Sequence, residues 1–198
     1  MLLEADQAQL VLLDYQVRLM PTMWESHWVL ANALRLGEVA RLLGMPCWGT
    51  EQHPALLGPQ LPQVRALCGR TLTKMQFSAG GEGLTEWLRP PTKPQAGNVR
   101  SLPKHLQKAA SPVRPMVVIA GCEAHVGVLQ TALDLLEDEF EVWVVTDACS
   151  SRTERNRDAA FDRLAGAGAE LLTTEMFAFE CLRSAEHPDF AAVQALIK

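Results

Sequence analysis

Short apolar runs alternate along the chain with longer segments of helical periodicity. Residues Leu10–Leu13 form a continuous apolar run, and runs of this kind are typical of strands buried on both faces of a parallel sheet. In residues 24–43 the apolar positions recur at intervals of four and three, which predicts a helix. Gly44 ends that helix. The apolar residues that follow predict a second strand over residues 47–50.

The second half of the chain alternates more regularly. Strands are expected over residues 116–120, 142–145 and 171–172. Helices are expected between and after them, over residues 125–136, 154–167 and from 175 onward. Alternation of this kind implies right-handed crossovers and a doubly wound parallel sheet. We therefore predict an α/β fold.

The middle of the chain is less regular. Residues 72–77 include the end of a further strand in our interpretation. Residues 89–104 hold four prolines and little apolar periodicity. We interpret this segment as a surface loop and not as a domain boundary, because neither flank would form a separate core. With 198 residues and 48% hydrophobic content, the chain fits one domain spanning residues 1–198.

Charge and composition narrow the classes of partner. The net charge of −5 argues against nucleic acid, whose binding domains usually present a basic face. The first residues, Met1–Asp6, are acidic where a targeting peptide would be basic. No apolar run approaches the roughly 18 residues of a membrane span. We expect a cytoplasmic protein with no membrane partner.

The five cysteines are widely spaced and include no C-x-x-C pair. This spacing argues against a zinc ribbon or a thioredoxin motif. In a reducing cytosol we expect free thiols that fill the core.

Candidate chemistry lies where strands end, because ligands of doubly wound sheets bind beyond the carboxyl ends of the strands. Asp14 closes the first strand, and Thr50–Gln52 follows the second. Gly121–Gly127 joins a strand to a helix, so its backbone amides lie at a helix N-terminus.

One segment identifies a family resemblance. Gly121–Leu135 reads GCEAHVGVLQTALDL and closely resembles the strand-to-helix turn of the isochorismatase-like (cysteine hydrolase) superfamily, particularly its isochorismatase-domain proteins. Four other segments resemble further motifs of the superfamily in the same order, at residues 12–16, 50–52, 74–78 and 147–152. The resemblance implies a three-layer α/β/α fold with a six-stranded parallel Rossmann-like sheet.

The resemblance also implies a catalytic set. Most members use an Asp–Lys–Cys triad, in which the aspartate activates the thiol, the lysine stabilises charge and the cysteine attacks a carbonyl or nitrile carbon. Asp14 and Lys74 match the first two roles, and Gly127 takes the position of the cysteine. Because glycine cannot act as a nucleophile, this departure puts covalent hydrolysis in doubt.

True isochorismatases resemble this pattern, with Ala-His-hydrophobic-Gly at the turn, and hydrolyse a vinyl ether without a covalent intermediate. By that resemblance Asp14 protonates the vinyl carbon, water attacks the resulting cation, and pyruvate leaves. Burial would raise the pKa of such an acid and a neighbouring lysine would lower it. The residues expected to bind or orient the substrate are Gln52, Glu123, Ala124 and His125. Members typically carry a cis peptide in this turn, which the resemblance places here at Glu123–Ala124.

Gly127 has three open interpretations. It makes room for a substrate, it marks a catalytically silent homologue that serves as a binding or assembly module, or the protein uses another nucleophile. Glycine within a helix costs about 1 kcal/mol relative to alanine, which favours a packing or ligand reason. Cys122 lies five residues earlier, too far from the expected Asp–Lys position to replace the nucleophile.

No metal or cofactor is implied. Nicotinamidases of the superfamily place an aspartate and two histidines around the second-strand turn, and here only His53 lies nearby, with Glu51. No nucleotide-binding glycine motif occurs. We expect a small-molecule substrate and, because members commonly assemble, a homo-oligomer (a dimer or larger).

Overall fold

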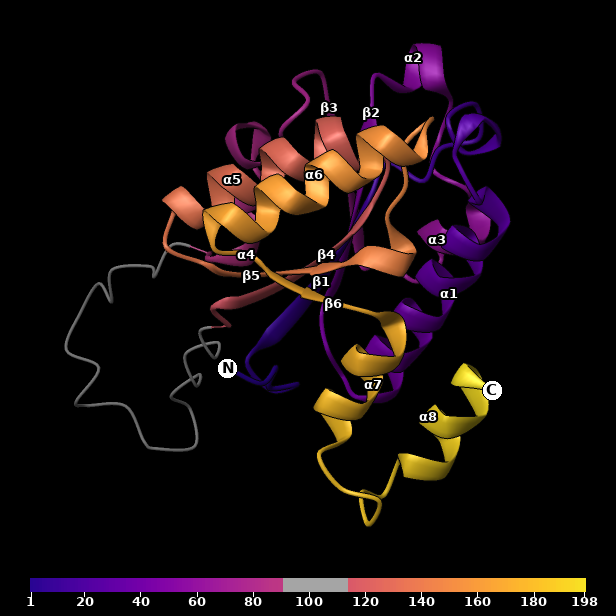
Figure 1. Ribbon diagram of the computed structural model, residues 1–198, viewed down its shortest axis with the longest axis vertical. Coiled ribbons are helices and arrows are strands. Elements are labelled where there is room, and N and C mark those ends of the chain that lie inside the picture. Colours follow the sequence, from indigo (N-terminus) through magenta and orange to yellow (C-terminus); the bar gives the residue numbers. More distant parts are fainter. Residues whose placement is uncertain (91–113) are drawn as a thin grey trace, which may run out of the picture.

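Six strands form one parallel sheet in the computed structural model, which describes residues 1–90 and 114–198 (Figure 1). The strands are β1 (Ala8–Leu13), β2 (Cys47–Gln52), β3 (Arg70–Lys74), β4 (Met116–Gly121), β5 (Glu141–Val145) and β6 (Glu170–Leu172). Their order across the sheet is β3-β2-β1-β4-β5-β6, and all five pairings are parallel. The predicted α/β fold with a six-stranded parallel sheet is therefore confirmed.

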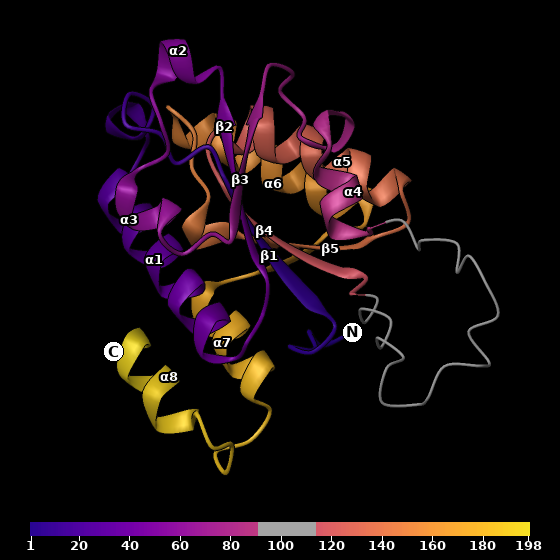
Figure 2. The same cartoon turned by 180° about the vertical axis from the view of Figure 1, so that it is seen from behind.

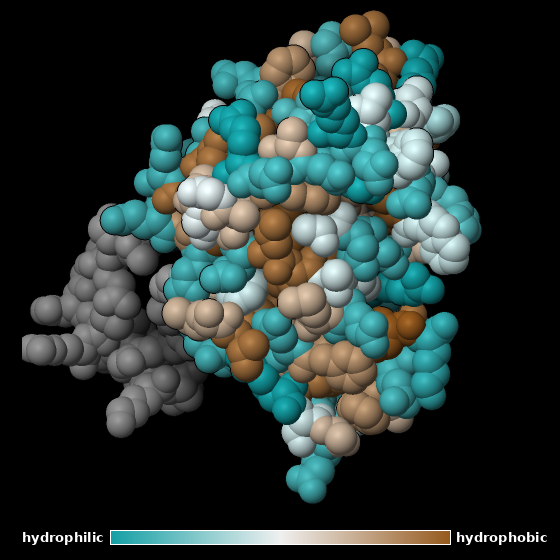
Figure 3. Space-filling model, in the orientation of Figure 1, coloured by the Kyte–Doolittle hydropathy of each residue, from teal (hydrophilic) through white to brown (hydrophobic). Residues whose placement is uncertain are grey.

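Helices cover both faces of the sheet (Figures 1 and 2). One layer contains α1 (Ser26–Leu42), α3 (Pro62–Arg65), α7 (Thr174–Leu182) and α8 (Phe190–Ile197), and the other contains α4 (Leu84–Leu88), α5 (Leu129–Glu137) and α6 (Glu154–Ala167). The short helix α2 (Pro54–Leu57) lies beyond the end of β2. The outer surface over α6 is largely hydrophilic (Figure 3).

The two central strands form the core of the sheet. β1 pairs with β4 over six residues, and every residue of both strands is buried. Burial on both faces explains why these strands are continuous apolar runs. Gly121 ends β4 so close to β1 that a Cβ there would lie 2.4 Å from the carbonyl oxygen of Leu13. A glycine is therefore needed where these strands meet.

The predicted helix at 154–167 has the expected bounds. The Thr153 side chain accepts a hydrogen bond from the backbone N–H of Asn156, which caps the N-terminus. Gly168 ends the helix with a φ of 99°, in the left-handed region that favours glycine.

Other boundaries differ from the prediction. The first helix begins at Ser26 and not at residue 24, and the second strand continues through Gln52. The helix expected over 125–136 begins instead with a π-helical turn, Ala124–Val128, before α5. Apolar spacing does not separate a π turn from an α turn, so the sequence pattern could not show it. Most of the predicted loop at 89–104 lies outside the described residues.

Short 3₁₀ turns at Met20–Thr22, Gly80–Glu82 and Thr146–Ala148 complete the described elements. None of the helices in residues 1–90 and 114–198 is long and apolar enough to span a membrane.

Candidate active site

The carboxyl ends of four neighbouring strands bring the candidate residues together. Asp14 follows β1, Gln52 and Lys74 are the last residues of β2 and β3, and the turn after β4 contains Gly127. The strand order reverses between β1 and β4, which is the switch point where ligands bind in doubly wound sheets.

Asp14 and Lys74 form a buried ion pair. Lys74 Nζ lies 2.8 Å from Asp14 Oδ2, and the two residues are 1% and 2% exposed. Nζ also donates to Gln52 Oε1 at 2.7 Å and to the Phe77 carbonyl at 2.9 Å. The three strong contacts use all three protons of the ammonium group. Lys74 is therefore a fully bonded cation with no proton left for a further anion.

The backbone conformation of Asp14 and a hydrogen bond from Thr50 orient the Asp14 carboxyl group. Asp14 has a φ of 54°, in a region that aspartate and asparagine tolerate better than most residues. Thr50 Oγ1 donates to Asp14 Oδ1 at 2.5 Å, and the Asp14 N–H donates to the Thr50 carbonyl. Burial raises the pKa of Asp14, and the effect of burial exceeds the opposing effects of Lys74 and Thr50.

Gly127 faces the Asp14 carboxyl. A Cβ added at Gly127 would lie 3.2 Å from Asp14 Oδ2, 3.5 Å from the Phe77 carbonyl oxygen and 3.8 Å from the Cys122 carbonyl oxygen. A side chain at position 127 would therefore begin in tight contact with Oδ2. The glycine leaves that position unfilled, with three oxygen atoms around it. The glycine lies in a π-helical turn, so its cost in a regular α-helix is not the measure that applies.

The other predicted residues hold the turn against the segment after β5. Glu123 Oε2 pairs with Arg152 Nε at 2.9 Å, and the Ala124 N–H donates to the Ser150 carbonyl at 2.7 Å. His125 Nδ1 lies 2.9 Å from Ser151 Oγ. The structure thus separates the predicted residues into two groups. Gln52 joins the ion pair, whereas Glu123, Ala124 and His125 position the turn; that these three also bind substrate stays a prediction.

The cis peptide of the turn lies between Cys122 and Glu123. The resemblance placed it at Glu123–Ala124, so the expected position was wrong by one residue. The observed position is where the chain leaves the sheet. The Cys122 N–H still donates to the Leu13 carbonyl of β1, and the next hydrogen bond of the turn, from Ala124, goes to Ser150.

Cys122 does not point toward the ion pair. Its thiol contacts the sulfur of Met20 at 3.7 Å, and the residue is 1% exposed. Burial raises the pKa of the Cys122 thiol well above its ordinary value. These features argue against a displaced nucleophile. The five cysteines are all free, as expected.

Sequence reasoning did not assign a role to Thr50. It considered Thr50–Gln52 as one group and selected only Gln52. The parallel register pairs Thr50 with Leu13, directly before Asp14, so the register is the signal that locates it. The backbone carbonyl of Phe77 was also missed, because a carbonyl acceptor has no signature in the side-chain sequence.

The carboxylate of Glu51, the acidic residue near His53 in the sequence, is already hydrogen-bonded within the protein. Glu51 Oε1 accepts from the Gln60 N–H at 2.8 Å and from Arg65 at 2.9 Å. Within residues 1–90 and 114–198, no group of three His, Cys, Asp or Glu side chains is arranged to hold a metal ion.

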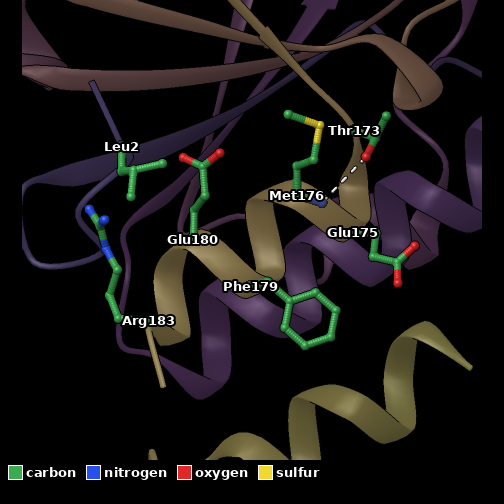
Figure 4. A pocket seen from close by; sticks show the side chains of 7 residues that line it. All are labelled: Leu2, Thr173, Glu175, Met176, Phe179, Glu180 and Arg183. Atoms are coloured by element: carbon green, nitrogen blue, oxygen red, sulfur yellow. Dashed lines mark hydrogen bonds between the residues drawn. The ribbon is translucent and has the colours of Figure 1, made fainter. Parts of the chain in front are cut away.

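A separate hollow of about 430 Å³ lies beside α7 and the N-terminal segment (Figure 4). Its lining residues are Leu2, Thr173, Glu175, Met176, Phe179, Glu180 and Arg183. None of them belongs to the group around Asp14, so this hollow is distinct from the candidate active site.

Comparisons with known proteins identify the family of the chain. Residues 8–176 match the family described as "Isochorismatase domain". The chain is 34% identical to isochorismatase domain-containing protein 2 of Danio rerio over 188 residues, which cover 95% of this chain and 85% of the relative. It is 36% identical to the Homo sapiens protein of the same name over 170 residues, covering 86% of this chain and 73% of the relative.

Solved structures of other proteins share the fold of this chain. The structure described as MAR1 ribonuclease from Caenorhabditis elegans superposes with a TM-score of 0.84 at 29% identity, covering 100% of this chain and 92% of that one. The Escherichia coli YcaC protein, described as an octameric hydrolase of unknown specificity, superposes with a TM-score of 0.80 at 25% identity, covering 99% of this chain and 89% of that one.

Proposed function

Given that this chain belongs to the isochorismatase domain family, we propose that it is a hydrolase that cleaves a small molecule without a covalent cysteine intermediate. The reaction class is the hydrolysis of a vinyl ether. Asp14 is the general acid, Lys74 and Gln52 position its carboxyl group, and the Gly127 turn accommodates the reacting bond.

The observation that carries this proposal is the space above Asp14. A Cβ at position 127 would lie 3.2 Å from Asp14 Oδ2, so a residue with a side chain would stand where a substrate atom has to approach the acid. We infer that Gly127 occupies the nucleophile position of the family's cysteine enzymes. Replacing a CH2SH side chain by hydrogen there removes the atoms that would otherwise lie against the carboxyl group.

Asp14 Oδ2 is the carboxyl oxygen that faces this space. Oδ1 accepts from Thr50 and Oδ2 accepts from Lys74, so the proposal places the acidic proton on the second lone pair of Oδ2, next to Gly127. Burial raises the pKa of Asp14, and a raised pKa increases the fraction of the acid that is protonated near neutral pH.

The proposed reaction has three steps: protonation, addition of water and collapse of the adduct. Asp14 transfers its proton to the terminal vinyl carbon, and an oxygen-stabilised cation forms. Water adds to the cationic carbon and loses a proton to the Asp14 carboxylate, which restores the acid. The resulting hemiketal or hemiacetal collapses to a carbonyl compound and an alcohol. Lys74, held by Gln52 and the Phe77 carbonyl, stabilises the transient carboxylate.

The test compares hydrolysis by the wild-type protein and the Asp14→Asn variant. Pyruvate release from isochorismate and phenol release from phenyl vinyl ether are measured separately. We expect Asp14→Asn to remove turnover, because asparagine fits the positive φ of this position but cannot donate a carboxylic proton.

Asp147→Asn is the matched control. Asp147 also follows the end of a strand, but its carboxylate accepts from the N–H and hydroxyl of Thr174. This variant should retain turnover. Equal turnover in wild type and Asp14→Asn, or none above the buffer rate for either ether, would contradict the proposal.

A second candidate is a catalytically silent homologue that serves as a binding or assembly module. The observation that favours it is the complete bonding of the Asp14–Lys74 pair at 2% and 1% exposure, since structural ion pairs have the same features. This function predicts an intact fold with no turnover, and partner binding that Asp14→Asn leaves unchanged.

We also propose that the protein assembles as a homo-oligomer. The support is the relative YcaC, whose structure is described as octameric. Light scattering measures the assembly directly, and a single monomeric species would contradict this expectation.

A further inference from the structure

The charged groups around Asp14 are paired with each other. Lys74 Nζ directs its protons to Asp14, Gln52 and Phe77. Arg152, on the segment that holds the turn, donates to Glu123 at 2.9 Å. Among the described residues, Lys74 beside the reaction site and Arg152 beside the turn are therefore each already paired with a carboxylate.

Two further arginines lie farther out and do not bond to this group. Arg18 is exposed and donates to the Leu56 carbonyl. Arg155 is exposed in the first turn of α6. Glu82, by contrast, brings a carboxylate to the segment after β3, where it accepts from the backbone amides of Met75 and Gln76. Within residues 1–90 and 114–198, no free cation contacts the ion pair.

The space over Gly127 is bordered by acceptors. Its three nearest atoms are Asp14 Oδ2 and the carbonyl oxygens of Phe77 and Cys122. Carbonyl oxygens attract N–H and O–H groups and repel carboxylates, and an unpaired carboxylate in a buried position carries a large desolvation cost. An anion at this position would lie against three oxygen atoms, which disfavours it relative to a neutral group.

Apolar side chains are exposed on the segments that frame the site. Met75 and Phe77 are 59% and 55% exposed. Their backbone carbonyls accept from Gln52 Nε2 and Lys74 Nζ, respectively, so both residues adjoin the ion pair. Leu56 on α2 is 63% exposed, and Figure 3 shows hydrophobic residues beside hydrophilic ones over α2. Large exposed apolar side chains on segments that bond to a site are available for ligand contact.

We infer that the substrate is an uncharged small molecule whose reacting bond lies over Gly127 and whose apolar group rests on Met75 and Phe77. This inference rests on the proposed function for the reaction, but it concerns which molecules the site accepts. It predicts that isochorismate, which carries two carboxylates, is a poor substrate.

The test uses two vinyl ethers that differ by one carboxylate, phenyl vinyl ether and 4-vinyloxybenzoate. Water converts each to acetaldehyde and the corresponding phenol, whose release is followed by absorbance. We expect kcat/KM for the neutral ether to exceed that for the carboxylate by about tenfold or more, because the carboxylate meets no free cation in the described part of the chain around the site.

Phe77→Ser and Phe179→Ser form a matched pair of variants. Phe179 is 40% exposed on α7, in the separate hollow. Phe77→Ser should raise KM for phenyl vinyl ether several-fold and leave kcat nearly unchanged, whereas Phe179→Ser should change neither. If 4-vinyloxybenzoate is hydrolysed as well as the neutral ether in an Asp14-dependent reaction, the inference is overturned and the proposed function stands.

If neither ether is hydrolysed, a measurement of ligand binding tests the inference instead. Calorimetry then compares two unreactive analogues, ethyl phenyl ether and 4-ethoxybenzoate. Tighter binding of the neutral analogue, weakened by Phe77→Ser, supports the inference even though the proposed reaction has failed. Equal affinity, preference for the benzoate, or no binding of either analogue overturns it. A Phe77→Ser variant that dissociates an oligomer and leaves ligand binding unchanged also overturns it, because the patch would then contact a second copy.

Glu123→Gln provides a gain-of-function test. Removing the Glu123 carboxylate frees the Arg152 guanidinium, which can then pair with a substrate carboxylate. We expect the ratio of the affinities for 4-ethoxybenzoate and ethyl phenyl ether to shift several-fold toward the benzoate, relative to wild type. No change in the preference between the two analogues would count against the pairing argument.

Discussion

Lys74→Met should destabilise the protein strongly, and the reason lies in the buried ion pair. The Lys74 side chain is 0% exposed and bonds Asp14, Gln52 and Phe77. Methionine fills a similar volume but leaves the Asp14 carboxylate buried with Thr50 as its remaining side-chain donor. Removing one partner of a buried pair typically costs about 3–5 kcal/mol. For a chain of this length that corresponds to a fall in Tm of roughly 6–20 °C.

The loss of stability in Lys74→Met should depend on pH. Burial already raises the pKa of Asp14, and Lys74 is the largest effect that opposes the rise, so the pKa rises further in the variant. A raised folded-state pKa contributes stability that is present below the unfolded value of 3.8 and lost as pH rises through the folded value. The variant should therefore be closer to wild type at pH 5 than at pH 8.

Equilibrium unfolding in urea, followed by the fluorescence of the five tryptophans, measures these differences. The double variant Lys74→Met/Asp14→Asn should lose less stability than the sum of the single variants, with a coupling of about 2–3 kcal/mol. Lys198→Met, at an exposed terminal residue, should stay within about 0.5 kcal/mol of wild type. Additive, pH-independent losses below about 1 kcal/mol would refute the account of a desolvated pair.

Three further predictions concern the same end of the sheet. If Asp14 is the general acid, kcat/KM for a vinyl ether falls as pH rises through its raised pKa, which lies above 3.8; a profile with no such limb, measured from pH 4 to 9, would exclude that role. Gly127→Cys should fold, because its Cβ meets Asp14 Oδ2 at 3.2 Å and needs a shift of only a few tenths of an ångström. Its thiol should react with iodoacetamide faster than the native cysteines and more slowly in an Asp14→Asn background, as followed by mass spectrometry; equal rates in the two backgrounds would show that Asp14 does not activate it. Gly121→Ala should cost about 1–3 kcal/mol by overpacking, since its Cβ would lie 2.4 Å from the Leu13 carbonyl. Gly166→Ala, within α6 and with no neighbour inside 4 Å, should add about 0.5–1 kcal/mol; chemical denaturation of both glycine variants checks the contrast.

Much of the architecture could be predicted because its signals are local. The run Leu10–Leu13 identified a central strand, since a strand covered on both faces has no polar side to alternate with. The helix at 154–167 was predicted with its observed bounds because a glycine, Gly168, follows its last turn, and the structure adds the Thr153 cap at the other end. Resemblance to family motifs placed Asp14 and Lys74 in one site, and the structure brings them to 2.8 Å.

Other features of the site have no local signal. The π-helical turn at Ala124–Val128 has the apolar spacing of an α-helix, so periodicity predicted an ordinary helix there. Glu123 was selected as a substrate ligand, but its carboxylate is held by Arg152 from the segment after β5. The pairing of these two residues depends on how β4 and β5 are placed side by side, which no single segment specifies.

The sequence by itself determined the central strands and the longer helices between them, which residues lie at strand ends, and that a glycine stands in the turn after β4. These features depend on burial periodicity and on backbone preferences within a few residues. Only the tertiary structure decided that Thr50 bonds Asp14, that Lys74 has no free proton, and that three oxygens border the space over Gly127. Such contacts join atoms from strands far apart in the chain. Hydrogen bonding and desolvation act over a few ångströms in space, so they take effect only once the sheet has assembled.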